Sequence, residues 1–256
     1  YAAWTWATDE GAKAWPGLPT PPRAKSRVVP GVPVPSDPLE PPTWREMDIL
    51  VDEARALKHP ASADVGDIFT LARGLGLRIG QVIRLKVGDV RGLHRRDQPT
   101  MIRIRPELGK TKQERRGRTV PVAPVVVPTI RRLVAGKKTE DTLFEREGRI
   151  NNYTLNNIVQ RSIDRGVRPE VFTSLERGNM RKTHYFRAGF ISGIQQLGAS
   201  KKAAQRLVGH QAADTADGAY DPATLQMLIE AVALVPEIAA SQDLPSRVLP
   251  LPAATG

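Results

Sequence analysis

The sequence predicts a mainly helical fold of the α+β class, with a small antiparallel sheet. Apolar residues recur at helical spacing over most of residues 43–235, which favours helices there. Thr100–Arg105 alternates between polar and apolar residues instead, which predicts a strand, with Arg118–Val122 as its partner. The chain has 256 residues, 40% of them hydrophobic, which suffices for one large domain or two small ones with a buried core.

The N-terminal region has a different composition. Residues 1–42 hold 10 of the 22 prolines, and proline fixes φ and pushes the preceding residue out of the helical region. We therefore expect residues 1–42 to be a Pro-rich linker or the remnant of an N-terminal region. Residues 43–240 should form the folded domain and residues 241–256 a flexible tail. The first residue is Tyr1, so we expect a fragment or a processed product.

The helices have recognisable starts and stops. Thr43 and Glu46 match a capping box. In this motif the threonine hydroxyl accepts a hydrogen bond from a backbone N–H of the first helical turn, and the glutamate carboxylate accepts one from the backbone N–H of the threonine. The second helix should end at the glycines Gly74 and Gly76. Helices are expected over about 44–58, 64–73, a short segment after Arg78, 125–135, 151–165, 182–197, 200–208 and 223–235.

The charge is strongly basic and unevenly placed. The net charge is +11 and the pI is about 10.2. Residues 78–118 hold 13 Lys and Arg against 4 Asp and Glu, so most of the surplus lies in one segment. Such clustering is typical of a nucleic-acid-binding face. A solvated surface that merely keeps the protein in solution is the alternative.

Several chemistries are excluded by the residues available. Cysteine is absent, which excludes disulfides, thiolate metal sites and a cysteine nucleophile. Four histidines without ligand spacing argue against a metal, and no nucleotide-binding glycine loop is present. No apolar run approaches the roughly 20 residues that span a bilayer, and no secretory signal is seen. We expect no cofactor, no metal and no membrane partner, and a cytoplasmic protein that is nucleoid-associated when it is bound to DNA.

Residues suited to phosphate chemistry cluster late in the chain. His184 and Arg187 are three apart and share one helix face. The planar fork of arginine suits phosphate oxygens, although a partly buried histidine and a surface arginine are the alternative. His210 follows Gly209, and Tyr220 comes ten residues later. A phenol of pKa about 10 needs neighbouring cations to act as a nucleophile.

Two further cations lie upstream. Arg78 stands at the start of a predicted helix, where the helix dipole is already positive, and a bound phosphate would relieve that conflict. Lys110 lies in the basic connection between the two strands, from which it can reach a phosphate and donate a proton; Lys112 competes for the same role. The alternatives are an arginine that points into water and a solvated hairpin lysine.

Together these motifs resemble the tyrosine recombinases, the phage integrase family, over roughly residues 43–235. The family's motifs appear in the same order. Their counterparts here are Gly74–Val90 for the first arginine box, Gly109–Val122 for the lysine hairpin, His184, Arg187 and Leu207–His210 for the second box, and Tyr220 for the nucleophile. One departure is Gln81, which stands where the family usually has an acidic residue that supports the local fold.

The resemblance implies a mostly helical catalytic domain with a small antiparallel sheet, acting on double-stranded DNA as a homotetramer. The residues that it implies around one scissile phosphate are Arg78, Lys110, His184, Arg187, His210 and Tyr220. The resemblance also leads us to expect further DNA-binding residues, namely Lys112, Arg115, Arg116 and Arg118.

The implied reaction is cleavage and rejoining through a 3′-phosphotyrosyl bond, as in the integrase of a mobile element. The phenol attacks, Lys110 protonates the leaving 5′ oxygen, and His184 assists proton transfer. The two arginines and His210 stabilise the transition state, without metal or cofactor. The alternatives are a strand-cleaving relative of the type IB topoisomerases and a DNA-binding relative that does not cut.

Overall fold

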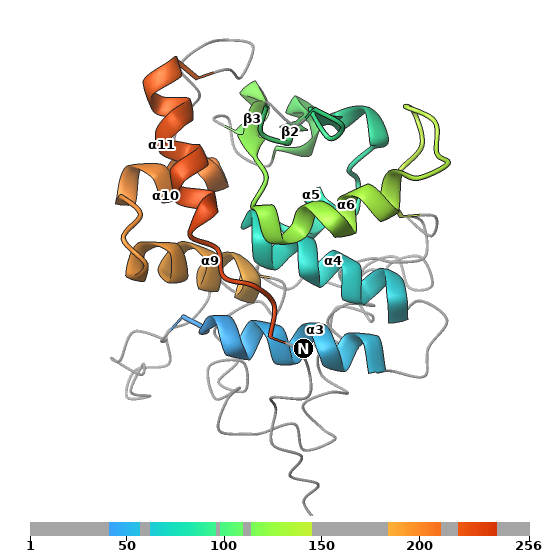
Figure 1. Ribbon diagram of the computed structural model, residues 1–256, viewed down its shortest axis with the longest axis horizontal. Helices are drawn as coiled ribbons and strands as arrows, with labels where there is room; N and C mark the ends of the chain where they lie inside the picture. The colour runs from blue at the N-terminus through green and yellow to red at the C-terminus, as the bar shows by residue number, and fades with distance from the viewer. Residues whose placement is uncertain are drawn as a thin grey trace, which may run out of the picture. The chain divides into compact units, whose positions relative to one another are not determined.

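The computed structural model describes residues 41–56, 62–95, 98–109, 114–144, 184–210 and 220–239 (Figure 1). The helices are α3 (Trp44–Ala56), α4 (Ser62–Leu75), α5 (Ile79–Val82), α6 (Val127–Val134), α9 (Tyr185–Gln196), α10 (Lys201–Val208) and α11 (Pro222–Ala233). The strands are β1 (Val90–Arg91), β2 (Met101–Ile104) and β3 (Arg118–Pro121). The predicted fold class, mainly helical with a small antiparallel sheet, is confirmed. The helix expected over 151–165 lies outside the described residues, and the domain boundaries stay predictions.

The first two helices test the predicted starts and stops. The capping box is confirmed, because the Glu46 N–H donates to Thr43 Oγ1 (3.3 Å) while the Thr43 backbone N–H donates to the Glu46 carboxylate. The stop at Gly74 is wrong: α4 runs through that residue, where any β-carbon would collide with Val126. The helix instead ends before Gly76, whose φ of +61° is left-handed.

The sheet has the order β1-β2-β3, with both pairs antiparallel. In β2, Ile102 and Ile104 are buried while Arg103 between them is exposed. The register pairs Ile104 with Arg118 and Arg103 with Thr119. Because successive strand residues face opposite sides, Arg118 faces inward with Ile104, whereas Thr119 faces outward with Arg103. The predicted strand pair is thus confirmed, and β1 is an additional strand.

Helix α4 lies at the centre of the domain and packs against α3, α5, α6 and α9 (Figure 1). The rings of Phe69 in α4 and Phe186 in α9 are 4.8 Å apart between centroids. Burying one such side chain stabilises the fold by about 1.5–3 kcal/mol. Helix α11 packs on α10 and on β3, so the last part of the chain is joined to the sheet.

A buried ion pair fixes the segment that follows α11. Arg73 in α4 is fully buried and pairs with Asp48 in α3. The same guanidinium donates to the carbonyls of Pro236 (2.9 Å) and Glu237 (3.2 Å). Burial raises the pKa of Asp48, and the positive charge of Arg73 acts in the opposite direction. The chain after α11 is therefore held against the two N-terminal helices of the domain.

Candidate active site

The C-terminal turn of α10, residues 205–210 (the α10 turn), gathers several of the predicted site residues. Gly209 has a left-handed φ of +82°. Its N–H donates to the Arg206 carbonyl (3.0 Å), and the His210 N–H donates to the Gln205 carbonyl (2.8 Å). These two bonds form a Schellman motif, which closes a helix at a glycine. The motif sets the direction in which the chain leaves α10 and leaves the side chain of His210 exposed.

Two buried arginines satisfy the remaining carbonyls of the α10 turn. Arg118 donates to the carbonyls of Leu207 (Nε, 3.3 Å) and Val208 (Nη2, 3.0 Å). Arg187 donates to the same Val208 carbonyl (Nη2, 2.7 Å). Each arginine is only 3% exposed. The last carbonyls of a helix have no partner within it and form the negative end of its dipole, so two cations are well placed there.

Arg187 also connects the α10 turn to the segment that precedes Arg78. Its Nη1 donates to the Gly76 carbonyl (3.3 Å), a residue 111 positions earlier in the chain. Gly76 lies directly against Phe190 of α9, with no space for a β-carbon. One guanidinium therefore joins the two segments in which the sequence predicted separate arginine boxes, and it fixes the distance between them.

Gln81 accounts for the position of Arg78. The Arg78 N–H donates to the Gln81 side-chain oxygen (3.2 Å), and the Gln81 amide nitrogen donates to the Leu108 carbonyl (3.3 Å). Gln81 is 1% exposed. A carboxylate could accept the first bond but has no proton for the second. The amide thus ties the Arg78 segment to the residues just before Gly109. Lys110 and Lys112 themselves lie outside the described residues.

Tyr220 lies against the α10 turn. Its hydroxyl donates to the Arg206 carbonyl at 3.4 Å, a long and hence weak bond. The Arg206 guanidinium lies 5.7 Å from the Tyr220 ring centroid, within range of a cation–π contact. Asp221 then caps α11 by accepting from the Thr224 N–H (3.0 Å). The phenol is half-buried, and the chain on its C-terminal side is fixed by the cap of α11.

Tyr185 makes a poor nucleophile by comparison. It is fully buried in α9. Burial raises its pKa well above the ordinary value, because the phenolate would be desolvated, and nearby Glu46 adds to the effect. Its neighbour His184 is half-buried and directly precedes α9, one turn before Arg187. Among these residues, Arg187, His210 and Tyr220 lie at the α10 turn. Arg78 follows two residues after the Gly76 carbonyl that Arg187 binds, and His184 lies one turn before Arg187.

Comparison with known proteins identifies the family. The family model described as "Phage integrase family" matches residues 44–225. This chain belongs to the phage integrase family. The resemblance found in the sequence motifs is therefore confirmed.

Two solved structures are similar to this phage integrase family chain. The integrase from mycobacterium phage Brujita has 17% sequence identity and a TM-score of 0.50, over 92% of this chain and 68% of that one. The XerH site-specific recombinase in a pre-cleavage complex with its difH substrate has 15% identity and a TM-score of 0.46, over 75% of this chain and 50% of that one. A comparison with curated proteins found no match. At these identities, the first likeness establishes the fold.

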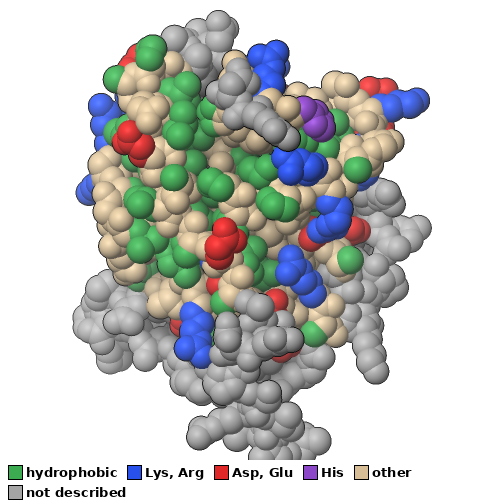
Figure 2. Space-filling view, viewed as in Figure 1, with side chains coloured by type: hydrophobic (Ala, Val, Ile, Leu, Met, Phe, Trp, Pro, Cys, Tyr) green, Lys and Arg blue, Asp and Glu red, His purple; other side chains and the backbone are tan. Residues whose placement is uncertain are grey.

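The predicted DNA-binding residues of this integrase-family chain fall into three groups. Arg115 and Arg116 are exposed on the short helix η3 (Glu114–Arg116). Arg118 is buried beneath the sheet, unlike the surface residue that we expected, and Lys112 is not described. The sequence did contain a signal for the inward orientation of Arg118, because Arg118, Val120 and Val122 are two residues apart and so share one face of the strand. On the face shown in Figure 2, Lys and Arg side chains are scattered rather than gathered.

Among the residues that the structure describes, no three or more His, Cys, Asp or Glu side chains come together in a way that would hold a metal ion. None of the described helices has the length and apolar character needed to cross a bilayer.

Proposed function

We propose that this chain is the catalytic domain of a site-specific DNA recombinase that cleaves and rejoins strands through Tyr220. The observation that carries the proposal is the meeting of Tyr220, Arg187 and His210 at the α10 turn, with Arg78 joined through Gly76. A phenol beside guanidinium groups is what attack on a phosphodiester requires, because the cations stabilise charge on the phosphoryl oxygens. Membership of the phage integrase family supports the same chemistry.

In the proposed first step, the Tyr220 oxygen bonds to the scissile phosphorus and gives up its proton, with His184 as the acceptor. The bond from phosphorus to the 5′ oxygen breaks, and that oxygen takes a proton from Lys110 or Lys112. The product is a 3′-phosphotyrosyl bond and a free 5′-hydroxyl. The long bond from Tyr220 to the Arg206 carbonyl is a weak contact that the phenol exchanges for the phosphate.

In the second step, the 5′-hydroxyl of a partner strand attacks the phosphotyrosyl bond and releases the phenol. The bond energy is kept in the covalent link, so no energy-rich cofactor enters. Arg78 and Arg187 hold the phosphoryl oxygens in both steps, and His210 donates to the same group. Exchange between two duplexes requires four protomers, so we propose that the protein assembles as a tetramer on DNA. We further propose that it is the integrase of a mobile element.

The test is covalent capture on nicked duplexes of randomised sequence around the nick, followed by denaturing gels and sequencing of the linked DNA. The wild-type chain should form an adduct, and Tyr220→Phe should bind DNA without forming one. Tyr185→Phe removes the same oxygen from the buried tyrosine and should keep the adduct. An adduct that persists in Tyr220→Phe would refute the role of Tyr220. Binding without an adduct in the wild type would favour a relative that does not cut.

A topoisomerase-like activity gives a different result. A monomer that relaxes supercoiled plasmid without joining two duplexes would support the type IB reading. A strand-exchange product between two linear duplexes, formed only at concentrations where the protein assembles, would support recombination. Both readings require the Tyr220 adduct, so the capture experiment is done first.

A further inference from the structure

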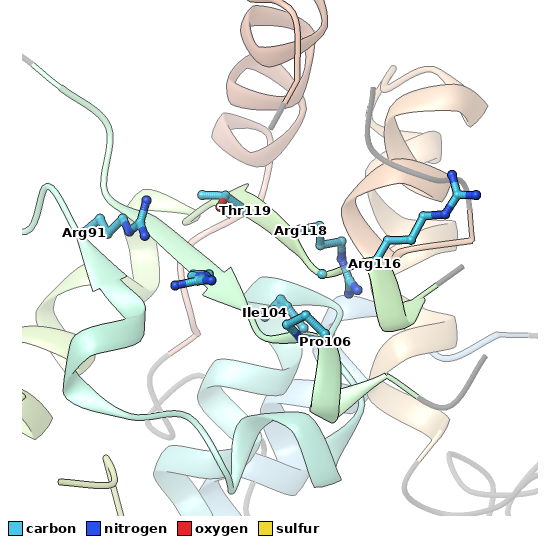
Figure 3. A pocket seen from close by; sticks show the side chains of 8 residues that line it. Arg91, Ile104, Pro106, Arg116, Arg118 and Thr119 are labelled. Atoms are coloured by element: carbon cyan, nitrogen blue, oxygen red, sulfur yellow. The ribbon is translucent and has the colours of Figure 1, made fainter. Parts of the chain in front are cut away.

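A basic pocket lies on the outer face of the small sheet (Figure 3). Its volume is about 400 Å³, and residues from all three strands and from η3 line it. We call it the sheet pocket. The residues that matter for the argument are Arg91, Arg103, Arg116 and Thr119. None of them belongs to the candidate active site.

The register of the sheet explains why these side chains share one face. Arg91 pairs with Met101, two residues before Arg103 on β2, and Arg103 pairs with Thr119. Side chains two residues apart on a strand face the same way, so the three side chains point outward together. Arg91 and Arg103 are diagonal neighbours, which places them about 7–8 Å apart.

Among the described residues, the sheet pocket is lined by arginines and by no acidic side chain, although Glu107 lies close enough to Arg103 to interact with its charge. Arg91, Arg103 and Arg116 are exposed, and none of them makes an ion pair with a residue in the described ranges. Arg105, from the same segment, behaves differently: it pairs with Asp89 (3.1 Å) and Glu107 (2.8 Å). A cleft lined by charge of one sign concentrates ligands of the opposite sign.

The spacing favours an extended polyanion over a single free phosphate. Figure 3 shows Arg91 and Arg116 at opposite ends of the sheet pocket, an arrangement that suits several phosphates in a row. A DNA strand presents a phosphate about every 3.4 Å along the helix axis, which suits a row of separated cations. The Thr119 hydroxyl can add a donor, as hydroxyl side chains commonly do at the DNA backbone.

The position of the sheet pocket relates it to the candidate active site. Arg118 lines the pocket, and its guanidinium holds the α10 turn through Leu207 and Val208. The sheet pocket and the α10 turn are thus on the two sides of one residue of β3, Arg118.

We propose that Arg91, Arg103, Arg116 and Thr119 bind backbone phosphates of duplex DNA beside the scissile phosphate. The inference rests on the proposed function, because it takes DNA as the substrate, but it concerns affinity rather than chemistry. Contacts to phosphates position a protein on the duplex and add salt-dependent affinity without reading sequence.

The test is the double variant Arg91→Gln/Arg103→Gln. Each phosphate contact contributes about −0.9 to the slope of log affinity against log salt, so the slope should become shallower by about 1.8. Between 50 and 200 mM salt, the wild-type affinity should fall about 12-fold more than that of the variant. At saturating DNA, the single-turnover rate of adduct formation should fall by a smaller factor than the affinity does, because saturation removes the effect of weaker binding.

The matched control is Arg45→Gln/Arg131→Gln, which removes two exposed arginines from α3 and α6. Its salt slope should equal that of the wild type. An unchanged slope in the pocket variant, or an equal loss in both double variants, would overturn the proposal, since the latter would reflect net charge alone. A shallower slope for the pocket variant alone, in a protein that never forms the adduct, would support the phosphate site and refute the proposed cleavage.

Discussion

Arg118 and Arg187 donate hydrogen bonds to one acceptor, the carbonyl oxygen of Val208. One arginine comes from the sheet and the other from α9, so the two sides of the domain meet at the end of α10. A carbonyl oxygen has two lone pairs, and here both are used by cations. The position of Arg187, a proposed phosphate ligand, thus depends on its neighbour from β3.

The first prediction concerns Arg118 as a positioning residue. Arg118→Gln should lower the free energy of unfolding by about 1–3 kcal/mol, because buried carbonyls at the α10 turn lose their donors. The adduct-forming rate at saturating DNA should fall, while DNA affinity changes little. Arg118→Lys should rescue only partly, since the ammonium carries its donors on one nitrogen, whereas the planar fork of Arg118 reaches the Leu207 and Val208 carbonyls from two separate nitrogens.

Chemical denaturation and single-turnover cleavage check this prediction. A matched loss of affinity and rate would indicate instead that Arg118 contacts DNA directly. Wild-type stability and rate in Arg118→Gln would show that the two bonds do not position the site.

The second prediction concerns the left-handed glycine of the α10 turn. A β-carbon at Gly209 would lie 2.5 Å from Arg118 Nη1. Gly209→Ala should therefore carry two costs, about 1–2 kcal/mol for the left-handed backbone and a further cost for displacing the guanidinium. Gly136→Ala is the control, because Gly136 has a similar φ of +72° and no atom near its β-carbon position.

In thermal unfolding, the midpoint temperature of Gly209→Ala should be lower than that of Gly136→Ala. The difference should shrink when both are made in the Arg118→Gln background, since the collision then loses its partner. Equal losses in the wild-type background would mean that the collision is relieved at no cost.

The third prediction concerns Gln81 and pH. Gln81→Glu keeps the acceptor for the Arg78 N–H but, when ionised, cannot donate to the Leu108 carbonyl. We expect a loss of about 1–3 kcal/mol at neutral pH. Burial should raise the pKa of the new carboxyl above its unfolded value of about 4.3. A raised folded pKa stabilises the variant below the unfolded pKa, and this contribution disappears as pH rises through the folded pKa.

The stability deficit of Gln81→Glu relative to the wild type should therefore be smallest near pH 4 and grow toward neutrality. Urea denaturation across that range measures it. Gln81→Met, which cannot titrate, is the control and should show a deficit that does not vary with pH. A deficit of Gln81→Glu that is flat with pH would contradict the role of the amide proton.

Local patterns predicted the elements well, because periodicity and capping act over a few residues. The capping box at Thr43 starts α3, and the alternating segment is β2. β1 was not predicted, since two residues are too few to show alternation. Gly74 was read as a helix stop, whereas its role is to let α4 approach Val126, a tertiary contact that no local pattern contains.

In the candidate site, too, the sequence predicted which residues belong together, whereas tertiary packing decided their contacts. Motif order indicated that Arg187 and Tyr220 act together, but the bond from Arg187 to Gly76 spans 111 residues and follows from packing alone. Arg118 was expected on the DNA from the family resemblance, and a motif match does not tell which face of a strand a residue occupies. The structure puts it under the sheet, where it holds α10.

The pairing of β3 with β2 has a consequence for how the hairpin between them can vary. A slip by a single residue would turn Arg118 to the solvent and send Thr119 into the core, dismantling the α10 contacts and the sheet pocket together. A slip by two would keep each side chain on its own side. The domain should therefore tolerate insertions and deletions that shift the register of β3 against β2 by an even number of residues, and not those that shift it by an odd number.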